Sequence, residues 1–138
     1  MAHEDLEVLR SYYRALAEGR FTDIGALFDP DVEYARASPA GEAAGLTGTW
    51  RGRTAMWAGV QEFVQAFDRV RVEAERFVEV GDQVLVLTRF QAIARSSGLP
   101  VEKDTADVMT VRGGKIVRYY SYWDRPDALR AVGLPDSG

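Results

Sequence analysis

Residues 107–134, DVMTVRGGKIVRYYSYWDRPDALRAVGL, decide the fold of this chain. Apolar and aromatic residues flank Gly113-Gly114 on both sides, and a Gly-Gly pair between two such runs is typical of a tight β-hairpin. The stretch predicts a strand over 101–112 and a second strand over 115–123. A short helix follows, which Asp124 can cap and Gly133 can end.

The first strand of this hairpin contains a carboxylate, Asp107, within a largely apolar run. Burial of an unpaired charge is costly, or it shifts the pKa of an acid upward. Asp107 is therefore the main candidate for function. From the residues alone, it either lines a ligand site or forms a structural pair with Arg89 or Lys103.

The N-terminal half predicts helices. Apolar residues at helical spacing, among them Leu9 and Tyr13, predict a first helix that ends before Gly19. A short second helix is expected between an N-cap at Thr22 and the Asp29-Pro30 pair. A third helix is expected over about 54–67, because its apolar residues fall on one face. The members of that face are Met56, Val60, Phe63, Val64 and Phe67.

Strands dominate the remainder. A brief strand is expected at 32–34 and a loop at 35–48, and longer strands at 70–80 and 84–94 precede the hairpin. Helices followed by an antiparallel meander indicate the α+β class. Residues 1–138 are expected to form one domain with a cone-shaped, antiparallel-rich sheet wrapped around three N-terminal helices and enclosing a pocket. Apolar residues on the outer sheet face favour a homodimer through that face.

Composition excludes several classes of function. The 138 residues carry a net charge of −4 with no clustered basic residues, which argues against nucleic acid as a partner. There is no cysteine, and the one histidine lies at position 3, so we expect no disulfide, no metal site and no cofactor. No apolar run approaches the ~20 residues of a membrane span, and the N-terminus has no signal-peptide core. We therefore expect a cytoplasmic protein without a membrane partner.

Four segments together resemble the nuclear transport factor 2-like superfamily, in its SnoaL-like and ketosteroid isomerase-like branch. They are YYRALAEGRFTDIGALFDPDVEY (12–34), TWRGRTAM (49–56), GDQVLVL (81–87) and DVMTVRGGKIVRYYSYWD (107–124). The resemblance covers nearly the whole chain and implies the cone-shaped fold. This fold hosts isomerases, cyclases, dehydratases, epoxide hydrolases, binding proteins and association domains, so it does not by itself select an activity.

The resemblance also implies roles for particular residues. Tyr12 and Asp107 match the tyrosine and the protonated acid of the isomerase oxyanion hole, where both groups donate to an enolate oxygen. Tyr34 occupies the position of the isomerase general base, and Ser121 that of the cyclase aspartate. Arg89 and Gln91 match the Arg-x-Asp pair of the epoxide hydrolases. The remaining candidates for ligand contact are Trp50, Met56, Phe63, Tyr119 and Trp123.

The register of the last hairpin decides which of these side chains face Asp107. The resemblance implies that Tyr119, Ser121 and Trp123 face inward, which requires a β-bulge near the turn. A simple two-residue hairpin would instead place Tyr120 and Tyr122 on the face of Asp107.

Two functional hypotheses follow. The first is an enzyme that acts on an apolar, carbonyl-bearing small molecule by proton transfer or addition of water, with Asp107 and Tyr12 as its catalytic pair. Arg89 and Gln91 would orient the polar groups of that ligand. The alternative is a non-catalytic ligand-binding or dimerisation domain, for which Asp107 would be held in a salt bridge.

Overall fold

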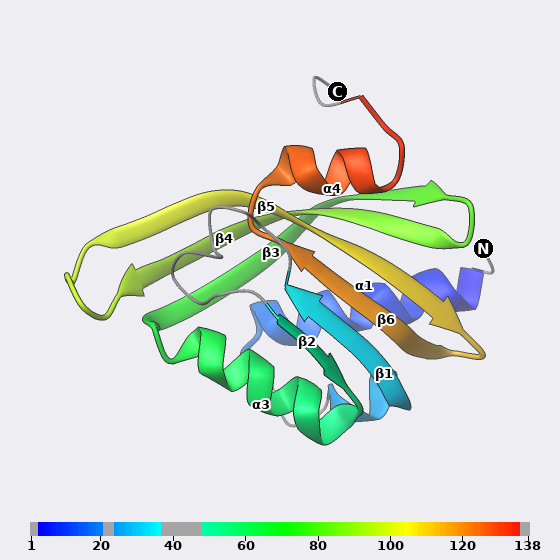
Figure 1. The fold of residues 1–138 in the computed structure, drawn as a ribbon, viewed down its shortest axis with the longest axis horizontal. Coiled ribbons are helices and arrows are strands. Elements are labelled where there is room, and N and C mark those ends of the chain that lie inside the picture. Colours follow the sequence, from blue (N-terminus) through cyan, green and yellow to red (C-terminus); the bar gives the residue numbers. More distant parts are fainter. Residues whose placement is uncertain (1–2, 21–23, 37–47, 136–138) are drawn as a thin grey trace.

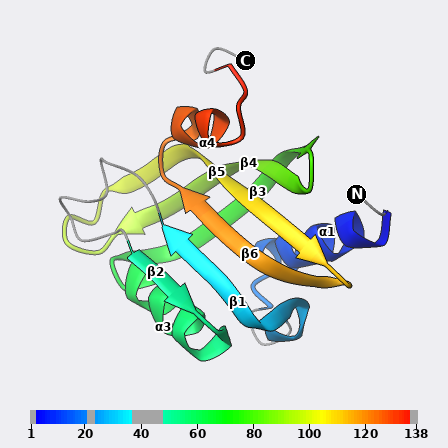
Figure 2. The ribbon, with the colours of Figure 1, turned by 45° about the vertical axis from the view of Figure 1, so that its right-hand side comes forward.

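The computed structural model describes residues 3–20, 24–36 and 48–135. In this part of the chain, six strands form one sheet in the order β2-β1-β6-β5-β4-β3 (Figures 1 and 2). Neighbouring strands pair antiparallel except β1 and β6, which are parallel. The elements are α1 (His3–Ala17), the 3₁₀ turn η1 (Gly25–Leu27), β1 (Phe28–Arg36), β2 (Gly48–Arg51), α3 (Arg53–Val64), β3 (Phe67–Val80), β4 (Gln83–Ala94), β5 (Pro100–Arg112), β6 (Lys115–Tyr122) and α4 (Arg125–Ala131). The predicted α+β class with a curved, mostly antiparallel sheet is confirmed.

The sheet separates two apolar layers. On the inner face, side chains such as Val84, Val86 and Met109 pack with α1, and all three are fully buried. On the outer face, the alternate residues Leu85 and Val108 pack with α4. Because successive side chains of a strand point to opposite faces, the same two strands support α1 on one side and α4 on the other (Figure 2).

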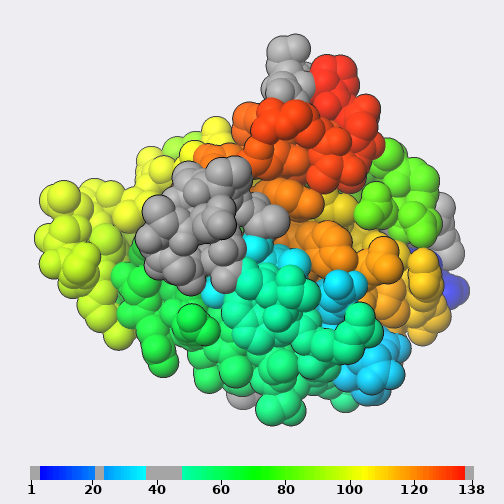
Figure 3. Space-filling model, viewed as in Figure 1, coloured from blue at the N-terminus to red at the C-terminus, as the bar shows by residue number. Residues whose placement is uncertain are grey.

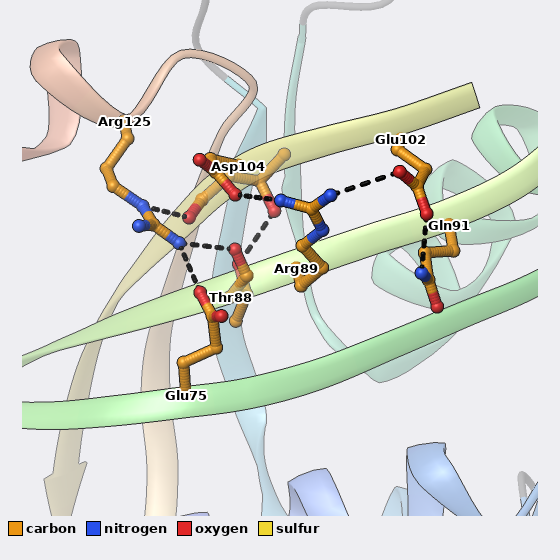
Figure 4. Close-up of polar contacts among 8 residues, drawn as sticks. Glu75, Thr88, Arg89, Gln91, Glu102, Asp104 and Arg125 are labelled. Atoms are coloured by element: carbon orange, nitrogen blue, oxygen red, sulfur yellow. Dashed lines mark hydrogen bonds and ion pairs between the residues drawn. The ribbon is translucent and has the colours of Figure 1, made fainter.

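Arg125, at the start of α4, ties this helix to the outer face. Its Nε donates to the carbonyl of Thr105 at 3.1 Å, and its Nη2 donates to the carbonyl of Thr88 at 2.7 Å. The same nitrogen also pairs with Glu75 at 2.8 Å (Figure 4). One guanidinium therefore bridges three strands and fixes where α4 begins.

A β-bulge in the last hairpin sets the register around Asp107. Arg112 pairs with Lys115 and Val111 with Ile116, but Thr110 pairs with Arg118. The extra residue in β6 brings Ser121, rather than Tyr120, opposite Asp107. The simple hairpin is therefore not the one adopted.

Two expected helix boundaries are wrong. The expected second helix is reduced to the single turn η1, and Phe28 already begins β1; Thr22, its expected N-cap, lies outside the described residues. The third helix ends at Val64, and Phe67 begins β3 instead of continuing that helix. Phe28 pairs with Ile116 of β6 and Phe67 with Ala94 of β4, so pairing with distant strands overrides the local helical pattern.

The expected loop over 35–48 is also wrong at both ends. Strand β1 continues to Arg36, and Gly48 begins a strand, β2, that the sequence did not predict. These residues pair with each other, Arg36 opposite Gly48, and so stabilise two short strands that neither segment indicates alone. The residues between them, 37–47, lie outside the described part.

The turn that joins β4 to β5 extends from the body of the molecule, at the left of Figure 3, and carries Leu99 with 64% of its surface exposed. Among the described residues, no helix is long and apolar enough to cross a membrane.

Candidate functional site

A cavity of about 330 Å³ lies between the inner face of the sheet and helices α1 and α3. Most of its wall is apolar, and α3 contributes Met56, Val60 and Phe63 to it. The ionisable or hydroxyl-bearing side chains that line it are Tyr12, Tyr34, Arg36, Thr88, Thr105, Asp107, Tyr119, Ser121 and Tyr122.

Asp107 is the carboxylate of this wall, and it is only 4% exposed. The hydroxyl of Tyr13 donates to its Oδ2 at 2.5 Å. Burial raises the pKa of Asp107 to about 6, while hydrogen bonds from Tyr13 and Ser121 partly oppose this rise. Near neutral pH, Asp107 can therefore release and accept a proton.

The hydroxyl that is bonded to Asp107 belongs to Tyr13, whereas the family resemblance implied Tyr12 as its partner. Consecutive residues of an α-helix point about 100° apart. Tyr13 lies on the stripe of α1 that packs on the sheet, directly over Asp107, while Tyr12 lines the cavity. Tyr12 contacts Tyr119 by an edge-to-face ring contact at 5.7 Å and by a hydrogen bond.

Three tyrosines of the cavity wall form a set of hydroxyl donors: Tyr12 and Tyr34, which are buried, and Tyr119, which is partly buried. Tyr34 and Tyr119 lie with ring centroids 5.0 Å apart on the adjacent strands β1 and β6. Burial, together with the nearby charge of Asp107, raises the pKa of Tyr12 and of Tyr119 well above the ordinary value. Burial likewise raises the pKa of Tyr34, although Arg36 opposes this rise. All three therefore stay protonated and keep a hydrogen to donate.

Arg89 and Gln91 do not lie in the cavity, contrary to the prediction. Arg89 donates to Asp104 at 2.8 Å and to Glu102 at 3.1 Å, and Gln91 donates to Glu102 at 2.8 Å (Figure 4). The reason is strand alternation: Thr88 and Phe90 of the same strand line the cavity, so their neighbours face outward.

Neither salt bridge considered for Asp107 is present. Arg89 pairs with acids on the outer face, and Lys103 pairs with Asp124 at 2.9 Å. The groups that hold the Asp107 carboxyl are hydroxyls and not cations.

Trp50 also departs from the prediction, because it is not among the cavity-lining residues. Its indole packs against Gly59 of α3 so closely that a Cβ there would lie 2.6 Å from the ring. It also packs against Tyr34 with the two rings tilted, and their centroids lie 5.3 Å apart. The other candidates for ligand contact do line the cavity: Tyr34, Met56, Phe63, Tyr119, Ser121 and Trp123.

The sequence reasoning missed Arg36, which lines the cavity and is 6% exposed. Its Nη1 donates to the carbonyl of Gly59 at 2.6 Å, and its guanidinium lies 4.6 Å from the ring centroid of Trp50 and 5.3 Å from that of Phe63. The loop expected over 35–48 includes residue 36, so the sequence does not single out this arginine. The alternation Val32, Tyr34, Arg36 along β1 was the signal that could have found it.

Nothing in the described segments suggests a metal centre, since no group of three or more His, Cys, Asp or Glu side chains there is arranged to hold an ion. The cavity contains one carboxylate, Asp107, among its described lining residues. The chemistry that this wall can supply is proton transfer and hydrogen bonding.

Comparison with known proteins agrees with this architecture. Residues 9–119 match the model of the SnoaL-like domain. An uncharacterized PhzA/B-like protein of Pseudomonas aeruginosa is 28% identical over 131 residues, which cover 92% of this chain and 89% of that protein. An NTF2-like protein of unknown function from Burkholderia pseudomallei has a similar crystal structure, with a TM-score of 0.77, 20% identity, and coverage of 96% of this chain and 100% of that one. TerC, co-crystallized with polyporic acid, superposes with a TM-score of 0.75 at 22% identity, covering 94% of this chain and 97% of its own.

Proposed function

This protein belongs to the SnoaL-like family, and on that basis we propose that its cavity binds an apolar, carbonyl-bearing small molecule and that Asp107 transfers a proton to or from that ligand. The observation that carries the proposal is the buried carboxyl of Asp107, which lies in a mostly apolar cavity and has a pKa of about 6. A general acid or base works best when its pKa is near the working pH. The crystal structure of TerC with polyporic acid supports the ligand-binding part by analogy of fold.

The proposed reaction begins with Asp107 in its carboxylate form. It removes a proton from the carbon next to the ligand carbonyl, and the electrons of the broken C–H bond form an enolate. The neutral hydroxyls of Tyr12, Tyr34 and Tyr119 are positioned to donate hydrogen bonds to the negative oxygen, which lowers the energy of the enolate. Asp107, now protonated, returns the proton to a different carbon, which completes an isomerisation.

Tyr13 and Ser121 act through Asp107 in this scheme. Tyr13 is not among the residues that line the cavity, so its role is to position the Asp107 carboxyl and to limit the rise of its pKa. Ser121 donates to the same carboxyl from the neighbouring strand. Loss of either hydroxyl should therefore displace the pH–rate profile rather than only lower its maximum.

The experiment is a test of deuterium uptake. The protein is incubated in D₂O with a panel of apolar ketones and enones, and exchange at the α carbon is followed by NMR across a range of pH. We expect the exchange rate to change with pH around a midpoint near the pKa of Asp107. In Asp107→Asn the rate should fall about 100-fold or more. Asp104→Asn, which changes an outward-facing carboxylate of the same strand, is the matched control and should behave as wild type.

The outcomes separate the two functional hypotheses. Ligand binding without exchange anywhere in the panel would favour the non-catalytic binding domain, for which the two hydrogen bonds on Asp107 would be purely structural. If exchange occurs and Asp107→Asn matches wild type, the assignment of Asp107 is wrong. Absence of both binding and exchange rejects the proposal.

A homodimer through the outer sheet face remains part of the proposal. Helix α4 covers Leu85 and Val108, while Leu87 and Tyr120 lie partly buried beside them. These half-buried apolar side chains are the candidates for burial against a second copy. Sedimentation equilibrium measures the association directly, and a monomer at all accessible concentrations would reject it.

A further inference from the structure

Two threonines form a hydrogen-bonded pair in the wall of the cavity. Thr88 of β4 lies opposite Thr105 of β5, and their hydroxyl oxygens are 2.7 Å apart. Both side chains line the cavity, and Thr88 is 1% exposed and Thr105 8% exposed. The proton transfer proposed above uses neither hydroxyl, so the pair is a separate polar feature of the same cavity.

The pair has one hydrogen more than its internal bond uses. Each threonine hydroxyl carries one hydrogen that it can donate. One of the two hydrogens lies in the bond between the residues, and the other has no acceptor within the described part of the chain. A buried donor without an acceptor is costly, so this hydrogen suits an oxygen that enters the cavity. Because Thr105 is the more exposed residue, the arrangement in which Thr88 donates to Thr105 leaves the second hydrogen where a ligand can reach it.

The backbone of both threonines is held in place by one side chain. Arg125 donates through Nε to the carbonyl of Thr105 at 3.1 Å and through Nη2 to that of Thr88 at 2.7 Å (Figure 4). A threonine side chain also has few χ1 rotamers, since it branches at Cβ. The hydroxyls are therefore held in a fixed position, and little conformational entropy is lost when a ligand accepts a hydrogen bond from them.

The threonine pair and the tyrosine donors lie on opposite sides of Asp107. Thr105 and Asp107 are two residues apart on β5, so they share one face of the strand and are separated by roughly 7 Å along it. Tyr119 pairs with Met109, which is two residues from Asp107 in the other direction. A ligand whose carbonyl meets the tyrosines can therefore extend past Asp107 toward the threonines.

We propose that the Thr88–Thr105 pair is a second recognition site of the cavity, in which Thr105 donates to a neutral hydroxyl or carbonyl oxygen of the ligand. The substrate is then a ring ketone with a second oxygen function, roughly 7 Å from the carbon that meets Asp107. This inference rests on the proposed function and deepens it by naming the class of substrate. Phe90 and Trp123 line the cavity with ring centroids 5.4 Å apart, and this aromatic wall accommodates the rings of such a ligand.

The test compares two isomers that differ only in the position of the second oxygen. 6-Hydroxy-2-tetralone carries its hydroxyl across the fused ring from the ketone, and 8-hydroxy-2-tetralone carries it beside the benzylic α carbon. Both are neutral at pH 7, since a phenol has a pKa of about 10, and 2-tetralone is the reference without a second oxygen. Dissociation constants are measured by calorimetry. We expect wild type to bind the 6-hydroxy isomer about fivefold more tightly than the other two, as for one neutral hydrogen bond.

A double variant assigns this preference to the threonines. Thr88→Val combined with Thr105→Val keeps the shape of both side chains, and removal of both hydroxyls together leaves no donor without a partner. The two isomers should then bind equally. Thr110→Val is the matched control and should keep the wild-type preference, because Thr110 is a buried threonine of β5 that is not among the cavity-lining residues. Melting temperature and near-ultraviolet circular dichroism confirm that each variant is folded.

The outcomes separate this inference from the proposed function. Binding of all three ketones without a preference for the 6-hydroxy isomer overturns the inference and leaves the proposed function standing. A preference that survives in the double variant also overturns it, since the hydroxyl is then recognised elsewhere. If wild type binds none of the three, the proposed function fails together with the inference. Should the double variant not fold, Thr105→Val alone decides, because its hydroxyl is the one assigned to the ligand.

Discussion

The burial of Asp107 predicts an unusual dependence of stability on pH. The folded protein holds the Asp107 proton up to a pKa of about 6, whereas an ordinary aspartate releases it at 3.8. Between these values the native state binds more protons than the unfolded chain, so unfolding becomes easier as the pH rises. This stabilising contribution is complete below the lower value and is lost as the pH passes the higher one.

The size of the effect follows from the displacement of the pKa. One unit corresponds to about 1.4 kcal/mol, so the rise of Asp107 from 3.8 to about 6 corresponds to about 3 kcal/mol of unfolding free energy. Asp107→Asn removes the titration and keeps a side chain of similar shape. Relative to this variant, wild type should lose about 3 kcal/mol between pH values near 4 and near 7.

The assay is urea unfolding of both proteins at a series of pH values, followed by tryptophan fluorescence. Subtraction of the variant from wild type cancels the titration of all shared groups, provided that they act independently of Asp107. Asp104→Asn serves as the control, because it makes the same chemical change at a carboxylate that is 54% exposed. A constant difference between wild type and Asp107→Asn across the whole range would refute the buried, raised-pKa description of Asp107.

Three further predictions concern single contacts. Tyr13→Phe removes a hydrogen bond that lowers the pKa of Asp107, so the ¹³C NMR titration of that carboxyl should move above its wild-type midpoint of about 6. Gly59→Ala places a Cβ 2.6 Å from the Trp50 ring; we expect it to lower the unfolding free energy by about 1–3 kcal/mol, more than offsetting the gain of up to about 1 kcal/mol that alanine brings to a helix. Arg125→Ala removes the donor to two strand carbonyls, and urea unfolding should show a loss of about 1–3 kcal/mol.

Matched variants separate these effects from general damage. Tyr12→Phe removes a hydroxyl that is not bonded to Asp107 and should move its midpoint less than Tyr13→Phe does. Gly25→Ala meets no atom within 4 Å and should be nearly neutral. Arg89→Ala removes the exposed ion pairs with Asp104 and Glu102 and should lower the unfolding free energy less than Arg125→Ala does. If a variant and its control show the same shift of the Asp107 midpoint, or the same loss of unfolding free energy, the contact assigned to that variant is wrong.

The local pattern was sufficient where a segment's neighbours in the sequence determine its conformation. Gly113-Gly114 predicted the last hairpin, because both residues adopt the positive φ angles that favour glycine. The spacing of Met56, Val60 and Phe63 predicted which face of α3 is turned inward. Asp107 could be recognised as exceptional because a carboxylate rarely occurs within an apolar strand.

The sequence pattern was insufficient where contact with a distant segment of the chain decides the conformation or the orientation of a side chain. Periodicity places Tyr12 and Tyr13 on one helix, but only the position of α1 over β5 shows that Tyr13 reaches Asp107. Arg36 was hidden because β1 is extended by its pairing with β2 and β6, and residues of both strands lie far from it in the sequence. Pairing of this kind depends on the whole sheet and overrides local preference.

By itself, the sequence determined the α+β class, the last hairpin and the presence of one exceptional carboxylate. Only the tertiary structure decided that a bulge in β6 brings Ser121 opposite Asp107, that Arg89 faces outward and that Arg36 faces inward. The physical reason is that a strand has two faces related by a shift of one residue. Local composition cannot choose between them until the register with the neighbouring strands is set.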